Sequence, residues 1–204
     1  MKYALYIFLS LLLLSSCYVI PEREISVSDL DYPDTLQVIK RNQWGWKQLE
    51  KKLPRHEIEK ITLHHGGVDF PEDKDPAQHL RNLQSWSRNE KEWIDIPYHF
   101  MIDLQGIIYE ARPIMYPGAT NTDYDPTGHA LICLMGNYEN AEVNREQLDA
   151  IIDLMAFLVI EFDVSTKDIK GHKDYTETQC PGKNLYRYLS DETIQNAVKA
   201  KIEK

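Results

Sequence analysis

The chain has 204 residues, 43% of them hydrophobic and 27% charged, which is enough for one well-buried domain with short appendages. Its formal net charge of -9 argues against nucleic acid as a partner, because nucleic-acid binding requires a basic surface. No segment repeats at a fixed period, so a solenoid is not expected.

The N-terminal residues 1–16 have the features of a signal peptide: Lys2, an apolar core from Tyr3 to Leu14, and two small residues before Cys17. This core of about a dozen residues is shorter than the roughly 20 that a transmembrane helix needs. The ending resembles a bacterial lipoprotein box, which implies cleavage before Cys17 and a lipid on its sulfur. We therefore expect a lipid-anchored protein of the bacterial cell envelope, in the outer membrane or periplasm. The alternatives are an ordinary secreted protein and an uncleaved anchor.

Residues 17–40 follow as an expected tether, since they are rich in Pro, Glu, Ser and Asp and poor in apolar residues. The remaining residues 41–204 are expected to form one domain. Its first strand spans residues 57–64 and runs into the pair His64 and His65. Because side chains alternate along a strand, only one of this pair is expected to face a given cleft.

Further along, a helix is predicted over residues 75–87 from its apolar spacing, with His79 and Arg81 off the apolar stripe and in solvent. Strands at 98–103 and 107–111 form a predicted hairpin, in which Tyr98 and Phe100 share one face and His99 lies on the other. The remaining predicted elements are a strand at 130–135, a long helix that begins at Asn144, a short strand at Ile169, and helices at 185–189 and 192–202. Together they predict an α/β fold with a mixed central sheet flanked by helices.

Residues 113–128 show no regular pattern and are rich in Pro, Gly, Asn, Thr and Asp. A loop of this length inside a compact domain usually has a function. We place it at the rim of a substrate groove, with Asn121 and Tyr124 as candidate contacts to a glycan or a peptide.

The segment from Gly171 to Gly182 is a predicted loop with two zinc donors, His172 and Cys180. Two donors do not hold a zinc ion, and one imidazole of the His64 and His65 pair is the candidate third ligand. Taken alone, a histidine and a cysteine at this spacing are also compatible with a surface residue and a buried apolar residue. Cys133 lies in an apolar run and is expected in the core; a disulfide to Cys180 would consume the thiolate that zinc needs.

Six pieces of the chain resemble, in order, the zinc-dependent N-acetylmuramoyl-L-alanine amidase family, which includes the peptidoglycan recognition proteins and the phage lysozyme-type amidases. These pieces are Arg41-Asn42-Gln43-Trp44-Gly45, Leu63-His64-His65, Trp93 to Phe100, Gly106 to Arg112, Gly136-Asn137-Tyr138, and Gly171-His172 through Cys180-Pro181-Gly182. The chain departs from the family at Thr120, where a histidine is frequent, and at His129 to Ile132, where Ser-Ile-Gly-Ile is frequent.

The resemblance implies a zinc ion bound by His64, His172 and Cys180, and catalytic roles for Tyr98 and Thr178. Relatives that only recognise peptidoglycan generally lack the cysteine ligand. Candidate substrate contacts are His65, His99, Asn121 and Tyr124, and His99 is also the alternative metal ligand or base.

Three protein ligands leave one position of a tetrahedral zinc open, as in catalytic sites. The implied activity is zinc-dependent hydrolysis of the amide between N-acetylmuramic acid and L-alanine, with the glycan strand and stem peptide of peptidoglycan as partners. A non-catalytic peptidoglycan-binding protein of the same fold is the main alternative, and a zinc peptidase that cuts within the stem is a weaker one.

Overall fold

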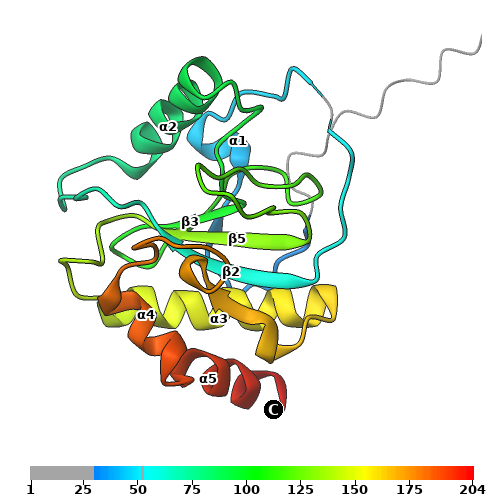
Figure 1. Ribbon diagram of the computed structural model, residues 1–204, viewed down its shortest axis with the longest axis vertical. Helices are drawn as coiled ribbons and strands as arrows, with labels where there is room; N and C mark the ends of the chain where they lie inside the picture. Colours follow the sequence, from blue (N-terminus) through cyan, green and yellow to red (C-terminus); the bar gives the residue numbers. More distant parts are fainter. Residues whose placement is uncertain (1–29, 52) are drawn as a thin grey trace, which may run out of the picture.

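The computed structural model describes residues 30–51 and 53–204. They form a single domain in which a six-stranded mixed sheet lies between two groups of helices (Figure 1). The signal peptide, Cys17 and the first part of the predicted tether lie outside the described residues. The elements, in chain order, are β1 (Val38–Ile39), α1 (Arg41–Trp44), β2 (Lys60–His65), α2 (Pro76–Glu90), β3 (Phe100–Ile102), β4 (Ile108–Glu110), β5 (His129–Leu134), α3 (Arg145–Phe162), η1 (Thr166–Asp168), β6 (Ile169–Gly171), η2 (His172–Asp174), α4 (Lys183–Ser190) and α5 (Thr193–Ile202).

The strand order is β1-β4-β3-β5-β2-β6. Among the strands of the described residues, only the β3–β4 hairpin is antiparallel, and the other four pairings are parallel. Parallel strands are usually covered on both faces, and β2 and β5 are accordingly buried almost throughout. The predicted mixed sheet and flanking helices are confirmed.

Two apolar clusters fill the two faces of the sheet. Along β5, Ala130, Ile132 and Leu134 pack in the cluster that includes α3, α4 and α5. Cys133, between them, belongs to the smaller cluster beside α1 and α2. This alternation is the pleat of a strand with both faces buried.

The two long helices begin where the sequence predicts. Asp75 caps α2 by accepting a hydrogen bond from Ala77 N at 2.9 Å, and Pro76 takes the first helical position. Asn144 caps α3 by accepting from Gln147 N at 2.8 Å. No helix within the described residues is both long and apolar enough to cross a membrane.

The end of the predicted tether belongs to the folded domain. Val38 and Ile39 pair with β4, and Leu36 is buried. Tyr32 donates a hydrogen bond to Glu110 Oε1 at 2.7 Å. Residues 30–40 are therefore part of the domain, although their composition is typical of a linker.

Candidate metal centre

The sheet register brings two histidines together. β2 and β6 are parallel neighbours in which Leu63 pairs with Gly171. His64 is the next residue of β2, and His172, the first residue of η2, directly follows β6, so both imidazoles lie at the carboxyl ends of these neighbouring strands. Their ring centroids are 4.5 Å apart.

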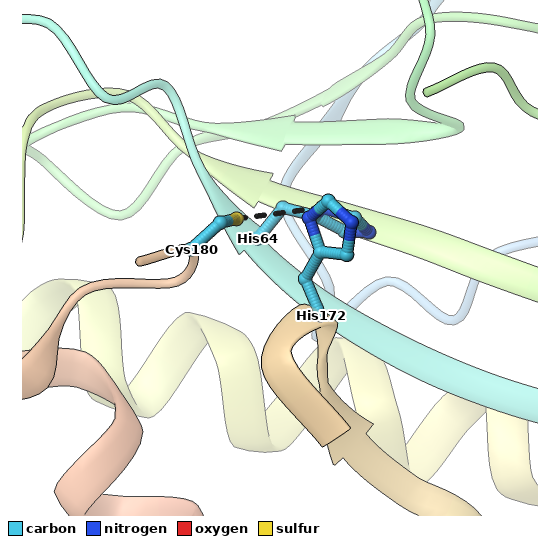
Figure 2. Close-up of side chains that lie close together, drawn as sticks. All are labelled: His64, His172 and Cys180. Carbon is cyan, nitrogen blue, oxygen red and sulfur yellow. Dashed lines mark hydrogen bonds between the residues drawn. The ribbon is translucent and has the colours of Figure 1, made fainter. Parts of the chain in front are cut away.

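The loop after β6 returns to these strand ends and supplies a thiol. Lys173 N donates to Cys180 O at 3.0 Å, which closes the loop between His172 and Cys180. Asp174 braces the start of the loop, since its carboxylate accepts from Gly171 N at 2.7 Å and from the Tyr186 hydroxyl. Figure 2 shows the Cys180 sulfur directed at the His64 imidazole, with the His172 ring beside them.

The donor atoms of His64, His172 and Cys180 all lie within 4.8 Å of one another. Cys180 Sγ is 3.5 Å from His64 Nδ1. Ligand atoms around a tetrahedral zinc are about 3.4 to 3.7 Å apart, given the usual Zn–N and Zn–S bond lengths. The distance between Cys180 Sγ and His64 Nδ1 therefore matches that of two ligands of one ion, and the His172 donor lies within 4.8 Å of both.

The protonation states of the two histidines also suit a metal. Burial and the neighbouring His172 hold the pKa of His64 well below its ordinary value, and burial lowers the pKa of His172 to about 4. Both imidazoles are thus neutral, as metal ligands must be. Burial raises the pKa of the Cys180 thiol to about 12 in the absence of an ion.

An unpaired nitrogen is the clearest sign that the residues fit zinc. His172 Nε2 is hydrogen-bonded to Thr122 Oγ1 at 2.8 Å. Its other nitrogen, Nδ1, is buried and has no hydrogen-bond partner among the described residues. A buried polar atom without a partner is costly, so an ion at the cluster would resolve it. Two imidazoles and a thiolate are a donor set that zinc prefers.

The cluster opens into a cleft of about 460 Å³. Its walls come from β2, from α2 and from the long loop between β4 and β5. Aromatic side chains line part of it, and polar groups surround the metal cluster. The residues lining the cleft include Val68, Phe70, His79, Leu83, Trp86, Trp93, Pro97, Ala119, Thr120 and Thr122.

The two expected catalytic side chains both line this cleft. The ring of Tyr98 lies 5.2 Å from that of His64. Thr178 Oγ1 accepts a hydrogen bond from Cys180 N at 3.2 Å, which leaves its hydroxyl hydrogen free to point elsewhere. Tyr98 precedes β3 and packs on the cleft side of the sheet, whereas Phe100 packs on the opposite face with α3. The expectation that Tyr98 and Phe100 share one face is therefore wrong.

His65 and Asn121 also line the cleft. Both histidines of the adjacent pair reach it, contrary to the expectation from strand alternation, because β2 ends at His65. His65 Nδ1 accepts a hydrogen bond from Tyr138 N at 3.1 Å. Since that nitrogen is an acceptor, Nε2 carries the proton and is available as a donor.

His99 and Tyr124, the other two expected substrate contacts, do not line the cleft. His99 is buried; its Nε2 lies 2.9 Å from Tyr116 O, and its Nδ1 accepts from Leu131 N. Both nitrogens are occupied by the main chain, so the structure excludes His99 as a ligand in the cleft. Tyr124 instead packs beside His172, with ring centroids 5.0 Å apart.

His79 and Thr122 are among the cleft residues that the sequence did not indicate. His79 lies on the cleft wall with its ring 5.2 Å from that of Phe70, rather than in solvent. Thr122 contacts a metal-ligand candidate 50 residues away in the chain, and nothing in its local sequence signals this. Cys133 is free and buried, and Cys180 is also free, so within residues 30–51 and 53–204 no disulfide competes for the thiol.

Comparisons with known proteins agree with this geometry. Residues 54–183 match the family model described as N-acetylmuramoyl-L-alanine amidase. Peptidoglycan-recognition protein SD of Drosophila simulans is 31% identical over 163 residues, covering 74% of this chain and 83% of that protein. An N-acetylmuramoyl-L-alanine amidase of Mus musculus is 28% identical over 134 residues, covering 63% of this chain and 25% of its own. The crystal structure of Drosophila peptidoglycan recognition protein SD superposes with a TM-score of 0.69 at 26% identity, over 76% of this chain and 94% of that one.

Proposed function

The chain belongs to the N-acetylmuramoyl-L-alanine amidase family, which includes the peptidoglycan recognition proteins, and from this we propose that it is a zinc-dependent amidase. The proposed reaction is hydrolysis of the amide between N-acetylmuramic acid and L-alanine in bacterial peptidoglycan. The observation that carries the proposal is the group of three donors, His64, His172 and Cys180, within 4.8 Å of one another at a cleft. The presence of Cys180 favours an enzyme over a receptor.

His64, His172 and Cys180 would hold the ion, and zinc bound there would supply Lewis acidity, activating a water molecule and polarising the scissile carbonyl. The protein contributes neutral imidazoles that are already positioned. The loop closed by the hydrogen bond from Lys173 N to Cys180 O holds the sulfur at the cluster.

Tyr98 and Thr178 flank the cluster and would act on the substrate. A phenol has an ordinary pKa near 10, so Tyr98 is a hydrogen-bond donor rather than a base at neutral pH. It would donate to the carbonyl oxygen as negative charge develops there. The Thr178 hydroxyl, which already accepts from Cys180 N, would donate its own hydrogen to the same oxygen.

The cleft also suits a substrate that is part sugar and part peptide. Phe70, Trp86 and Trp93 offer apolar faces, on which sugar rings and aliphatic side chains pack. Asn121 and the Nε2 proton of His65 offer polar contacts for a peptide backbone.

Digestion of purified sacculi tests the proposal. We expect free stem peptides that begin with L-alanine, identified by mass spectrometry, with release abolished by a chelator and restored by zinc. Cys180→Ser should abolish release, while Cys133→Ser, which makes the same change at a cysteine outside the donor group and keeps a hydrogen-bonding side chain there, should retain it. Shortened stem fragments would instead indicate a peptidase, and tight sacculus binding without release would indicate a receptor.

We further propose that the protein is a lipoprotein of the bacterial envelope, anchored through Cys17. The support is the sequence alone: an apolar core followed by Leu14-Ser15-Ser16-Cys17. Metabolic labelling with a fatty acid should mark the wild-type protein and not Cys17→Ala. Equal labelling of the two would refute the anchor.

A further inference from the structure

His64 and His172, the two imidazoles of the candidate metal centre, each have their Nε2 atom close to the same loop. Thr122 Oγ1 lies 2.8 Å from His172 Nε2, and the Tyr124 hydroxyl lies 3.4 Å from His64 Nε2. These two loop residues, between β4 and β5, are only two positions apart. One short segment therefore contacts the far side of each histidine ligand.

The contact at His172 is backed by a second hydroxyl. Thr120 Oγ1 lies 2.7 Å from Thr122 Oγ1 and also accepts a hydrogen bond from Thr122 N at 3.1 Å. If the Thr122 hydroxyl donates to Thr120, its oxygen is left to accept from His172 Nε2–H. A neutral imidazole that is protonated at Nε2 has its lone pair on Nδ1. That is the buried nitrogen without a partner among the described residues.

The contact at His64 follows the same pattern. Its Nδ1 lies 3.5 Å from Cys180 Sγ, while its Nε2 is the nitrogen near Tyr124. Tyr124 is itself held by neighbouring rings: it stacks on Tyr175 with centroids 5.6 Å apart and lies 5.4 Å from the His129 ring. The hydroxyl is thereby fixed on the Nε2 side of His64.

We propose that Thr120, Thr122 and Tyr124 are positioning residues of the metal centre, which hold the His64 and His172 rings with Nδ1 toward the sulfur of Cys180. Groups that hydrogen-bond the outer nitrogen of a histidine ligand fix its tautomer and orientation, and their loss typically weakens metal binding by about 10- to 100-fold. The affinity part of this inference rests on the proposed zinc centre. The expected tautomers of His64 and His172 do not rest on that zinc centre, because they are properties of the metal-free protein.

The test compares Thr122→Val, which keeps the shape but removes the hydroxyl, with Thr122→Ser, which retains it. Zinc affinity is measured by competition with a chromophoric chelator. We expect Thr122→Val to bind zinc about 10- to 100-fold more weakly and Thr122→Ser to bind within about threefold of wild type. Tyr124→Phe should lose about tenfold, at the lower end of that range because its contact is longer.

Thr127→Val is the matched control, because it makes the same change in the same loop at an exposed position. It should bind zinc as wild type does. Long-range ¹⁵N–¹H NMR of the metal-free protein gives a readout that needs no zinc: His172 should be protonated at Nε2 in wild type and in Thr122→Ser, and should populate the other tautomer in Thr122→Val.

The outcomes separate this inference from the proposed function. Zinc binding by Thr122→Val equal to that of wild type, or an Nδ1-protonated His172 in the wild-type protein, would overturn it. Failure of the wild type to bind zinc would refute the proposed function, and the NMR result would still decide the role of Thr122. If Thr122→Val does not fold, zinc affinity and the His172 tautomer are measured in Thr120→Val instead. This variant removes the hydroxyl that contacts Thr122, and a smaller loss of zinc affinity is expected.

Discussion

The hydroxyl of Tyr98 is the group in the cleft best suited to stabilise developing charge without binding a metal. Its ring is 5.2 Å from that of His64, and burial raises the pKa of the phenol well above its ordinary value. We predict that Tyr98→Phe lowers the rate of stem-peptide release by about 10²- to 10³-fold, the usual cost of losing one oxyanion donor.

The zinc affinity of Tyr98→Phe should remain that of wild type, because no ligand is touched. Tyr188→Phe is the matched control, since its hydroxyl accepts only a surface hydrogen bond from Arg187. Equal rates for Tyr98→Phe and wild type would remove Tyr98 from the mechanism.

The residues that sequence reasoning identified best are those in recognisable motifs. The resemblance to a known family implies His64, His172 and Cys180 as ligands, and the structure brings the three together. Strand alternation was less reliable: it did not indicate that His65 also reaches the cleft, where β2 ends. Thr122 could not be identified from the sequence. Its proposed role depends on a contact with His172, 50 residues away, from a loop that has no periodic pattern.

At the scale of elements, the ligand loop depends on a close approach of two backbones. Gly182 has φ +88°, and a Cβ there would lie 2.3 Å from Tyr138 C and 2.4 Å from Glu139 N. We predict that Gly182→Ala destabilises the protein by at least about 3 kcal/mol, from backbone strain and from overlap with main chain that cannot yield. It should also weaken zinc binding, because Cys180 is two residues away.

Gly128→Ala separates the effect of backbone strain from that of steric overlap with the main chain. Gly128 also has a positive φ, of +83°, but its nearest neighbour to an added Cβ is a Glu59 side-chain atom at 3.6 Å. Only the backbone strain applies there, so urea unfolding should show a loss of about 1 kcal/mol and unchanged zinc affinity. Similar losses for the two variants would contradict the close approach at Gly182.

Most elements could be predicted because their capping residues and apolar patterns match the positions that these residues take in the fold. Asp75 before Pro76, and Asn144 before an apolar stripe, mark true helix starts. β1 was missed because two residues carry no periodicity; Val38 and Ile39 become a strand only by pairing with β4. The strand order could not be predicted, since every parallel pairing joins strands distant in the chain.

For the whole molecule, buried neutral histidines predict acid sensitivity. Burial lowers the pKa of His99 to about 3, with Arg112 and His56 nearby, and lowers that of His129 to about 4, where Lys60 adds to the effect and Asp125 opposes it. In the unfolded chain both titrate near 6.5. Between these values the unfolded state binds more protons, so stability is complete above about pH 6.5 and is lost as the pH falls toward 4.

Urea unfolding of the metal-free protein from pH 7.5 to 4.5 tests the predicted loss of stability on acidification. Each histidine should contribute a slope of up to about 1.4 kcal/mol per pH unit in that window. His129→Gln should have a shallower slope than wild type. A free energy of unfolding that stays flat or rises on acidification would contradict the prediction.

Zinc is expected to stabilise the whole domain, because its ligands join β2 to the segment after β6. An ion at about 1,000 times its dissociation constant adds about 4 kcal/mol to the free energy of unfolding. We predict a clear upward shift of the melting temperature with zinc in wild type and Cys133→Ser, and little or none in Cys180→Ser. An equal shift in Cys180→Ser would place the ion elsewhere.

The order of the strands also bears on how the protein is made. In the part of the chain that the structure describes, β2 pairs with β5 and β6 alone, and both leave the ribosome after it. The nascent chain therefore carries the apolar Ile61 and Leu63 on an unpaired strand until residue 134 has been synthesised, a state that aggregates readily and that chaperones protect. Cys180 emerges later still, so a polypeptide that terminates after residue 134 but before residue 180 can pair β2 with β5 and still lacks one of the three donors.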